Sequence, residues 1–594
     1  MQSRIAFALA ALSVLLHWPF GHADFVYDDV DFIRANQSVY SLPAALAATL
    51  APFPPDQPER GLYRPLATLS HATDYAVFQD EPRGHHAVNA VLYGLLVLGV
   101  YALAREWFGA QSWTAVAATL VFAVHPVHCE AVDTISGRSE LLALGFAIAS
   151  LWVFLRSEDQ VDSAPRRGRH LLSGLLYALA CGSKESAVLL PAILVLHLLA
   201  RDGAPTGALA FTRRAVQHTS VHIAVACLYL ALRLEVLGGF GPAAPVLAGI
   251  DPLTRASTIG SVFAEYLRLM LWPGVLQLDF YYQYTLGVPS TPTLQSWIGW
   301  LAIAVLLGGT LLATAGALRG RATSLHSPRG AWIAGMGTGF VFLLPVSHLL
   351  GIGALMAERF LFAPSLGFVL FGCALSAHGM RRWIADPRAR QWIAIGALTA
   401  IALAGGTRSA LRASQWRDGV RLWESLARAT PNDYRPYSNA ATHWIARANY
   451  DAAEQSLRHA LELEPRDAAV RTNLAVVLME RGDLDGAEAI HRGLLAEDPR
   501  DVHARFNLGV IALRRDEVSL ALAHFEAALE VNPNFMPAAD NATAARARIE
   551  AARRYLHLHR VRAREAHESR DREFLETYRR ACRVAGDACS AANR

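Results

Sequence analysis

The sequence contains little charge for its length of 594 residues. Asp, Glu, Lys and Arg make up only 18% of the chain and 53% of the residues are hydrophobic, whereas about 25% charge is typical of soluble domains. The formal net charge of +4 is also small, so no extended basic surface for nucleic acid is indicated. These values argue against an ordinary soluble protein and indicate an integral membrane protein.

Cysteine is scarce as well, and the spacing of the six cysteines matches no common zinc site. Four of them lie in or beside apolar runs, where we expect them to pack in the interior: Cys129, Cys181, Cys227 and Cys373. Cys582 and Cys589 lie in the polar C-terminal tail. This last pair can form a disulfide only if the tail is in an oxidising compartment.

Lysine occurs once, at Lys184, against 54 arginines. A single lysine in such a composition indicates a position that requires a compact ammonium group, which is a point charge that approaches an anion closely. The alternative is that the lone lysine is there by chance.

Long hydrophobic runs are confined to residues 1–407, whereas residues 408–594 are rich in Ala, Arg and Glu. Because about 20 apolar residues span a bilayer as a helix, the first part is expected to be an all-α bundle with about eleven spans. The expected spans are 4–20, 87–104, 113–128, 141–155, 171–182, 187–200, 217–234, 296–318, 331–348, 361–378 and 392–407. We interpret the first span as a retained signal anchor and the run 258–278 as re-entrant or interfacial.

The distribution of arginine between these spans predicts their orientation, because cytoplasmic loops carry an excess of Lys and Arg. With a cytoplasmic N-terminus, the inner loops carry the arginines of 156–169, 201–214, 319–329 and 381–390, and the short outer loops carry only Arg138, Lys184 and Arg359. Everything after residue 407 is then expected outside the cytoplasm, together with outer loops at about 21–86 and 235–295.

The second part of the chain contains a sequence repeat. Four prolines recur every 34 residues, and so do three sets of Ala, Leu or Asn: Pro431, Pro465, Pro499 and Pro533; Ala453, Ala487 and Ala521; Ala460, Leu494 and Ala528; Asn439, Asn473 and Asn507. This period predicts tetratricopeptide repeats, an α-solenoid, over residues 434–533. A linker helix at 408–433 and a helical tail at 534–594 are expected to flank them. Such arrays form grooves that bind peptide segments; a spacer or dimerisation arm is the alternative.

Ionisable side chains gather at the ends of the expected spans on the outer side. They are Asp28, Asp29 and Asp31 in FVYDDVDFI; His125, His128, Glu130, Asp133, Arg138 and Glu140 in HPVHCEAVDTISGRSE; Lys184 and Glu185; and Glu358 and Arg359. Such groups cost roughly 2.5–3.5 kcal/mol each at membrane depth and therefore mark functional sites. A carboxylate can serve as general base toward a hydroxyl, and a cation can stabilise a leaving phosphate. A lipid-linked sugar phosphate is a substrate that requires both.

Six segments in order along nearly the whole chain resemble a known family. They are FVYDDVDFI (25–33), YRPLATLSHATDY (63–75), HAVNAVLY (86–93), HPVHCEAVDTISGRSELLA (125–143), SKES (183–186) and AERFLFAPSLGF (357–368). Followed by tetratricopeptide repeats, they resemble the TMTC family, transmembrane and tetratricopeptide-containing O-mannosyltransferases of the GT-C fold, in a bacterial-type member. The resemblance implies an inner-membrane enzyme that transfers mannose from a polyprenyl-phosphate donor to Ser or Thr hydroxyls of extracytoplasmic proteins, with inversion.

The same resemblance implies roles for individual residues. Asp28 or Asp29 is the expected catalytic base, and Lys184, Arg359 and Arg138 are the expected donor-phosphate ligands. Supporting positions are Arg64, His125, His128, Glu130, Glu140, Glu185 and Glu358. His125, His128 and Glu130 are also candidate ligands of a divalent metal, although a His-Pro-x-His segment at a helix end is more often structural. No other cofactor is expected. The expected partners are a lipid-linked sugar, membrane lipid and an acceptor protein or peptide held by the repeats.

Two other functions fit the same residues. One is an outer-face glycan polymerase or ligase that uses lipid-linked sugars and a glycan acceptor. The other is a non-catalytic membrane scaffold, in which the repeats are a docking platform. The outer-face charges argue against the scaffold, because a scaffold has no need of them at membrane depth.

Overall fold

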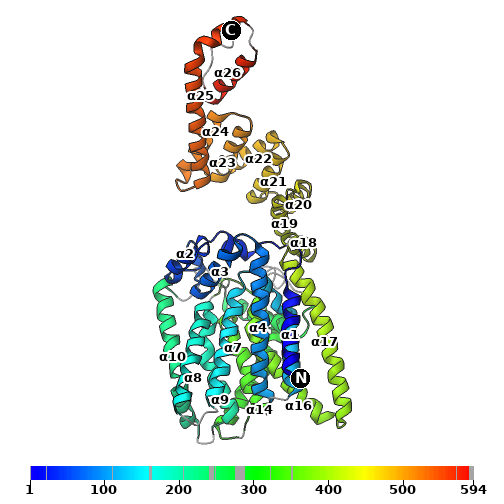
Figure 1. The fold of residues 1–594 in the computed structure, drawn as a ribbon. Coiled ribbons are helices and arrows are strands. Elements are labelled where there is room, and N and C mark those ends of the chain that lie inside the picture. Colours follow the sequence, from blue (N-terminus) through cyan, green and yellow to red (C-terminus); the bar gives the residue numbers. More distant parts are fainter. Residues whose placement is uncertain are drawn as a thin grey trace. The chain divides into compact units, whose positions relative to one another are not determined.

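The computed structural model divides into two compact units, residues 1–421 and 422–594. It describes residues 2–21, 23–109, 112–158, 163–204, 207–239, 247, 249–274, 288–289, 291–321, 323–349, 352–569 and 572–586. Within these ranges all regular secondary structure is helical (Figure 1). The expected fold class, a helical membrane bundle followed by an α-solenoid of repeats, is confirmed.

Seven helical runs of the first unit are long and apolar enough to cross a membrane. They are α4 (Pro82–Phe108), α7 (Arg138–Glu158), α10 (Ala208–Leu237), α13 (Leu294–Leu318), Pro328–Val346 (α14 Pro328–Gly330, η7 Ala331–Met336, α15 Gly337–Leu343 and η8 Leu344–Val346), Glu358–Trp383 (η9 Glu358–Leu361 and α16 Phe362–Trp383) and α17 (Pro387–Trp416). An eighth is bent by 50°, and joins α5 (Trp113–Ala123) to η5 (Pro126–His128) and α6 (Cys129–Asp133).

The count of about eleven spans is not confirmed, although each expected run contains a helix. The three remaining helices are α1 (Gln2–His17), α8 (Ser163–Ser183) and α9 (Leu190–Asp202). The apolar part of α1 and all of α9 are too short to meet the length of a span, and α8 begins with an arginine-rich turn. The run 258–278, which was expected to be re-entrant or interfacial, contains a continuous helix, α11 (Pro252–Leu271), as far as the structure describes it, and this helix packs closely on α13 where Gly260 meets Gly299.

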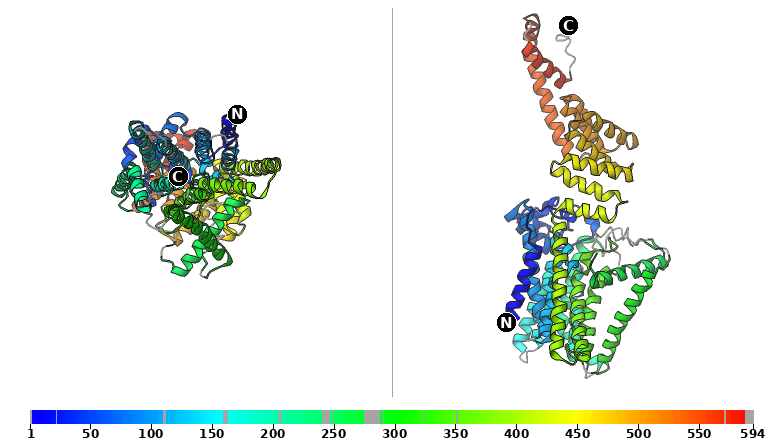
Figure 2. Two further views of the ribbon diagram at one scale, coloured as in Figure 1. Left: turned by 90° about the horizontal axis from the view of Figure 1, so that it is seen from below. Right: turned by 90° about the vertical axis from the view of Figure 1, so that its right-hand side faces the viewer.

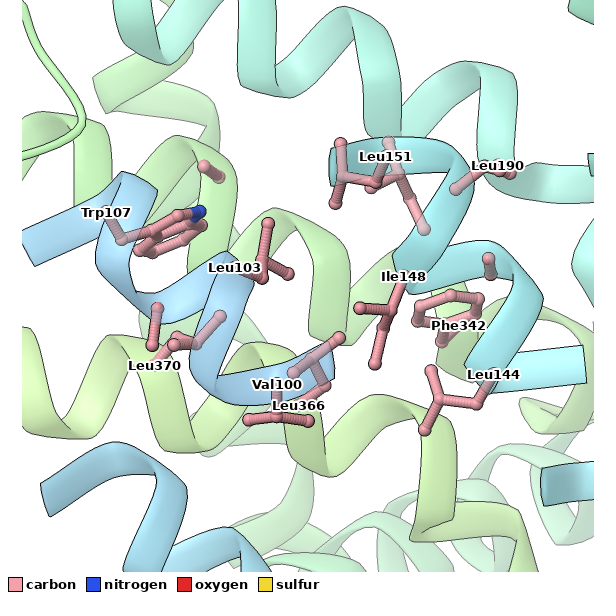
Figure 3. Close-up of a cluster of buried hydrophobic side chains, with 14 of the residues drawn as sticks. Val100, Leu103, Trp107, Leu144, Ile148, Leu151, Leu190, Phe342, Leu366 and Leu370 are labelled. Atoms are coloured by element: carbon pink, nitrogen blue, oxygen red, sulfur yellow. The ribbon is translucent and has the colours of Figure 1, made fainter. Parts of the chain in front are cut away.

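The interior of the first unit is packed at helical spacing (Figure 3). Val100, Leu103 and Trp107 of α4 face Leu144, Ile148 and Leu151 of α7, and α16 contributes Leu366 and Leu370. Intervals of three, four and seven residues place side chains on one face of a helix. Because lipid is as apolar as leucine, close packing rather than hydrophobic burial holds such helices together in a bilayer.

The segment between α1 and α4, which was expected to be the first outer loop, forms a layer of short elements at one end of the bundle, seen beside α2 and α3 in Figure 1. These elements are η1 (Val30–Arg34), η2 (Gln37–Val39), α2 (Leu42–Ala47), η3 (Ala48–Leu50), η4 (Pro58–Arg60) and α3 (Pro65–Phe78). Phe32 stacks on Phe53 with ring centroids 5.3 Å apart. The Arg60 guanidinium lies over the Phe32 ring and pairs with Asp31 at 2.5 Å. Asp31 therefore contacts a neighbouring element of this layer through Arg60.

The second unit is an array of paired helices (Figure 2). Its elements are α18 (Gly419–Ala429, shared with the first unit), α19 (Tyr434–Ala446), α20 (Tyr450–Leu463), α21 (Ala468–Glu480), α22 (Leu484–Glu497), α23 (Val502–Arg514), α24 (Val518–Val531), α25 (Met536–Ser569) and α26 (Arg572–Ala585). Asp433, Asp467 and Asp501 accept backbone hydrogen bonds at the starts of α19, α21 and α23, as N-cap residues do. The repeated alanines are fully buried, which lets the paired helices approach closely.

Enlarging one buried alanine should destabilise this unit. Ala487→Leu places three extra carbons into a fully buried contact on α22, which is expected to cost about 1–3 kcal/mol and to lower the Tm of the repeat unit. Thermal unfolding followed by circular dichroism measures the effect. Ala496→Leu, at an exposed position of the same helix, is the matched control, and equal Tm values for the two variants would contradict the assigned packing.

Candidate active site

The adjacent carboxylates Asp28 and Asp29 lie in different surroundings. Asp29 is fully buried and accepts hydrogen bonds from the backbone N–H of Ser136 at 2.8 Å and of Val26 at 3.5 Å. Burial raises the pKa of the Asp29 carboxyl to about 6, and these backbone hydrogen bonds oppose the shift. Asp28 keeps 24% of its side chain exposed, and its Oδ2 lies 3.5 Å from Nη2 of Arg359. Of the two, Asp28 is the one that a substrate can reach.

Arg359 connects Asp28 to a buried carboxylate. It lies in η9, immediately before α16. Its backbone N–H donates to Oε2 of Glu130 at 2.9 Å, and its guanidinium pairs with Oε1 of the same carboxylate. Glu130 is fully buried in α6, at the bend of the broken helix pair. Three segments more than 100 residues apart in sequence thus meet at one guanidinium.

Glu358 is fully buried beside this group and pairs with Arg412, whose Nη2 donates to Oε1 at 3.1 Å. Arg412 also lies over the Trp416 ring, 5.3 Å from its centroid. Arg412 was not among the expected site residues, because the expected span ended at residue 407 and the arginine lay in the expected linker helix. The helix α17 in fact continues to Trp416. The available signal in the sequence was an arginine less than two helical turns after the end of an apolar run. In the structure this arginine lies opposite a buried glutamate.

A second charged group contains the lone lysine. Lys184 pairs with Glu140 and is almost fully buried. Arg64 donates two hydrogen bonds to Glu185, at 3.1 and 2.9 Å, and a third to the Ser139 hydroxyl at 3.3 Å. Although burial acts to raise the pKa of the Glu185 carboxyl, the Arg64 guanidinium holds it below its usual range. The start of α3, the start of α7 and the break between α8 and η6 (Glu185–Leu189) are joined here.

The turn into α7 lies between the two groups. The Ser136 N–H binds Asp29, while Ser139 and Glu140 bind Arg64 and Lys184. Gly137 makes this turn tight: a Cβ there would lie 2.2 Å from the Ala131 carbonyl oxygen. These contacts bring most of the expected outer-face residues to one end of the bundle. They are Asp28, Asp29, Arg64, Glu130, Glu140, Lys184, Glu185, Glu358 and Arg359.

Arg138 differs from the other expected phosphate ligands because its side chain is fully buried. Its guanidinium donates to Asn89 at 2.5 Å, to Ser70 at 3.1 Å, to Asp74 at 2.6 Å and to the His85 carbonyl at 3.1 Å. These partners come from α3 and α4. The arrangement favours a structural role for Arg138, which holds α3, α4 and α7 together.

The two histidines of the 125–140 block are engaged with protein groups. His128 is hydrogen bonded to the Tyr93 hydroxyl and to the Ser365 hydroxyl, both at 2.8 Å. His125 accepts from the Val127 N–H at 3.3 Å and lies 3.2 Å from the Met270 carbonyl. Since Glu130 is paired with Arg359, no ligand atom of this trio is directed at a shared point, and the arrangement does not favour a metal there.

A different trio has metal-ligand spacing. The ligand atoms of His17, Cys129 and Asp133 lie within 4.8 Å of one another, and all three side chains are buried. His17 Nδ1 is 2.8 Å from Asp133 Oδ2, and Cys129 Sγ donates to the Ser409 carbonyl at 3.4 Å. These hydrogen bonds account for the proximity of the three side chains without a metal ion.

Comparison with known families gives two matches. A family described as dolichyl-phosphate-mannose-protein mannosyltransferase matches residues 64–236. A tetratricopeptide repeat family matches residues 444–505 and 478–549. The first match contains Arg64, Glu130, Glu140, Lys184 and Glu185, and the second covers the array of paired helices.

Among curated proteins, the chain is similar to two O-mannosyl-transferases. It is 24% identical over 479 residues to protein O-mannosyl-transferase TMTC3 of Mus musculus, which covers 76% of this chain and 50% of that protein. It is 27% identical over 540 residues to protein O-mannosyl-transferase Tmtc1 of Drosophila melanogaster, and this alignment covers 77% of this chain and 61% of that protein. The chain thus spans about half to three fifths of the length of these relatives.

Solved structures give a weaker likeness. The Archaeoglobus fulgidus oligosaccharyltransferase in complex with Zn and sulfate has a TM-score of 0.39 at 15% identity, covering 68% of this chain and 53% of that chain. The archaeal oligosaccharyltransferase AglB with an inhibitory peptide and a dolichol-phosphate has a TM-score of 0.36 at 14% identity, covering 72% and 58%.

The two matched families follow one another along the chain as the membrane unit and the repeat unit do. The curated relatives are TMTC proteins. The chain is therefore similar to the TMTC proteins, both in the order of its two parts and along most of its length.

Proposed function

We propose that the membrane unit transfers a sugar from a polyprenyl-phosphate donor to Ser or Thr hydroxyls of extracytoplasmic proteins, with inversion at the anomeric carbon. The names of the relatives and of the matched family suggest mannose as the sugar. The observation that carries the proposal is the pair of Asp28 and Arg359, a partly exposed carboxylate beside a cation that a buried glutamate holds in place.

Asp28 is proposed as the general base. Its carboxylate takes the proton from the acceptor hydroxyl while that oxygen attacks the anomeric carbon. The bond between this carbon and the phosphate oxygen breaks on the opposite face, which inverts the configuration and leaves polyprenyl phosphate. Asp29 is assigned a structural role, because it is fully buried and its oxygens accept the Ser136 and Val26 N–H groups.

Arg359 and Lys184 are proposed as the ligands of the donor phosphate. A guanidinium fixed beforehand at the position where negative charge develops stabilises a leaving phosphate without reorganisation in the transition state. The two bonds from Arg359 to Glu130 supply this fixation. Lys184 is paired with Glu140, and donor binding would add the phosphate as a further anionic partner.

Two features support an outer location for the repeats. The first is the arginine asymmetry of the loops, which places the N-terminus in the cytoplasm. The second is the pair of cysteines in the C-terminal tail, Cys582 and Cys589, which can form a disulfide in an oxidising compartment such as the periplasm. An acceptor polypeptide would meet the repeats and the charged end of the bundle in the same compartment. We propose the bacterial inner membrane as the location.

Replacement of the base should abolish transfer without unfolding the protein. Asp28→Asn is expected to lower kcat at least ~10²-fold, the usual contribution of a general base. The assay measures radiolabelled mannose moved from polyprenyl-phosphate mannose to a Ser/Thr peptide, with a nucleotide sugar as the inactive donor control. A rate within twofold of wild type, or transfer to a glycan rather than the peptide, would contradict the proposal.

Asp29→Asn should act on stability rather than on chemistry. Because the pKa of folded Asp29 is raised from 3.8 to about 6, its stabilising contribution is complete below about pH 4 and is lost as the pH rises through about 6. Asn stays neutral and keeps an oxygen for the Ser136 N–H. The Tm of the wild type should therefore fall more than that of the variant between about pH 5 and about pH 7.5. Equal decreases in Tm for the wild type and the variant would contradict a buried site that favours the uncharged form of the Asp29 carboxyl.

Removal of the phosphate ligand should slow the chemical step. Arg359→Gln is expected to reduce kcat about 10²–10³-fold, the usual effect of losing one donor at a developing charge. Arg60→Gln is the control, because Arg60 belongs to the same outer layer but pairs with Asp31. Single-turnover kinetics measure both variants. If Arg359→Gln and Arg60→Gln lose the same activity, Arg359 only supports the fold.

A further inference from the structure

An apolar groove runs along the membrane unit between α4, α7 and α8, which lie side by side (Figure 1). It has a volume of about 410 Å³, and every residue that lines it is apolar. Two of the lining residues, Leu95 and Trp152, are exposed on helices that are long and apolar enough to cross a membrane. The groove therefore opens toward lipid.

The dimensions of the groove limit what can occupy it. Its lining extends from Leu92 to Ala102 on α4 and from Leu141 to Trp152 on α7, which is about 15 Å at 1.5 Å per residue. This is half of a bilayer core about 30 Å thick, and so the length of an acyl chain in one leaflet. A volume of 410 Å³ spread over about 15 Å gives a groove about 6 Å wide, whereas a helix is at least about 10 Å wide. The groove is too narrow for a transmembrane helix.

An ion pair lies at one end of the groove. Arg156 follows the lining residue Ala149 by seven residues, and Glu106 follows Gly99 by seven. Seven residues are close to two helical turns, so both charged residues continue the lining faces of their helices. Arg156 Nη2 lies 2.7 Å from Glu106 Oε1, and the Arg156 guanidinium lies over the Trp152 ring, 5.7 Å from its centroid. A tryptophan beside cations is typical of the membrane–water interface.

Two further arginines give this end an excess of positive charge. Arg169 of α8 donates from Nη1 to the Arg156 carbonyl at 2.8 Å, and Arg105 precedes Glu106 on α4. Within the part of the chain that the structure describes, no carboxylate pairs with Arg105 or Arg169, and Nε of Arg105 is buried without a hydrogen-bond partner. Three guanidinium groups thus accompany one carboxylate, and an anion would complete the group.

The other end of the groove offers no such cation. Beyond Leu141 the next residue of α7 is Glu140, which pairs with Lys184. Glu140 precedes Ala149 by nine residues, or two and a half turns, so it lies on the opposite face of α7 from the groove. Lys184, the proposed ligand of the donor phosphate, is therefore on the far side of this helix. The geometry does not favour the chain of the sugar donor as the occupant.

We propose that the groove binds an anionic phospholipid, with one acyl chain between α4 and α7 and its headgroup phosphate at Arg156 and Arg169. Arginine side chains at this depth can extend along apolar surface to a charged headgroup. With a cytoplasmic N-terminus, this end lies in the inner leaflet, where basic pockets between helices bind anionic lipids. The bound chain would fill the space between helices whose outer ends carry Glu140 and Lys184. The inference uses only the membrane unit and is independent of the transfer reaction.

Lipid binding to the full-length protein tests the charged end. The protein in detergent micelles is titrated with phosphatidylglycerol or with phosphatidylcholine of the same acyl chains, and native mass spectrometry measures each Kd. The wild type should bind phosphatidylglycerol at least about tenfold more tightly, because each arginine near an anionic lipid contributes about a factor of five. Arg156→Gln combined with Arg169→Gln should remove this preference.

The control for charge is Arg381→Gln combined with Arg388→Gln. Both arginines are exposed at the same end of the bundle, in α16 and α17, away from the groove. This double variant has the same change in net charge and should keep the Kd for phosphatidylglycerol within twofold of the wild type.

Filling the groove tests the site of the acyl chain. A Cβ at Gly145 would meet no atom within 4 Å, so the side chain of Gly145→Leu can enter the groove without displacing protein. It should weaken phosphatidylglycerol binding at least about tenfold, with the Tm of the lipid-free protein unchanged. Gly396→Leu is the matched control, because Gly396 of α17 is exposed and a Cβ there also meets nothing within 4 Å. Its Kd should stay within twofold of the wild type.

The same measurements include the outcomes that overturn the inference. It fails if the wild type binds the two lipids with Kd values within twofold, or if either Gly145→Leu or the Arg156 and Arg169 variant binds phosphatidylglycerol as the wild type does. It also fails if polyprenyl phosphate displaces phosphatidylglycerol with an equal Kd, which would assign the groove to the donor chain. A dimeric wild type that Gly145→Leu makes monomeric would instead assign the groove to an interface between two copies.

Discussion

The charged end of the membrane unit depends on the pairing of buried carboxylates with arginine. Glu130 and Glu358 are fully buried, and a buried carboxylate is costly unless it is paired and hydrogen bonded. Arg359 and Arg412 meet this requirement. The same pairing fixes the geometry, because removing either partner would leave an uncompensated charge. A cation is thereby held beside Asp28, as the proposed site for a leaving phosphate requires.

Breaks in the helices create the positions for these groups. The bend between α5 and α6 supplies Glu130, the break between α8 and α9 supplies Lys184 and Glu185, and η9 supplies Glu358 and Arg359. Irregular backbone is tolerated in a membrane protein only where its polar groups are satisfied within the protein or face a cavity. Each break here also carries charged side chains that join it to a neighbouring segment, so the charged contacts coincide with the local departures from regular helix.

Much of the site could be predicted from the sequence, because ionisable residues at the ends of apolar runs are rare enough to indicate function. The pairings could not be predicted. Asp28 and Asp29 are adjacent and chemically alike, yet one faces Arg359 and the other is enclosed by the turn into α7. Arg138 looked like Arg359 in the sequence, but its partners are Asp74 and Asn89 of distant helices. Arg412 was overlooked because the end of an apolar run does not mark the end of a helix.

The sequence by itself determined the division into an apolar and a repetitive part, the helical class, the period of 34 residues and the set of charged residues. These features are local: they depend on hydropathy and spacing along one segment. Only the tertiary structure decided which carboxylate is enclosed and which arginine is bound by which glutamate. Such properties arise from contacts between segments tens to hundreds of residues apart, and burial and hydrogen bonding there depend on the whole packed bundle or array.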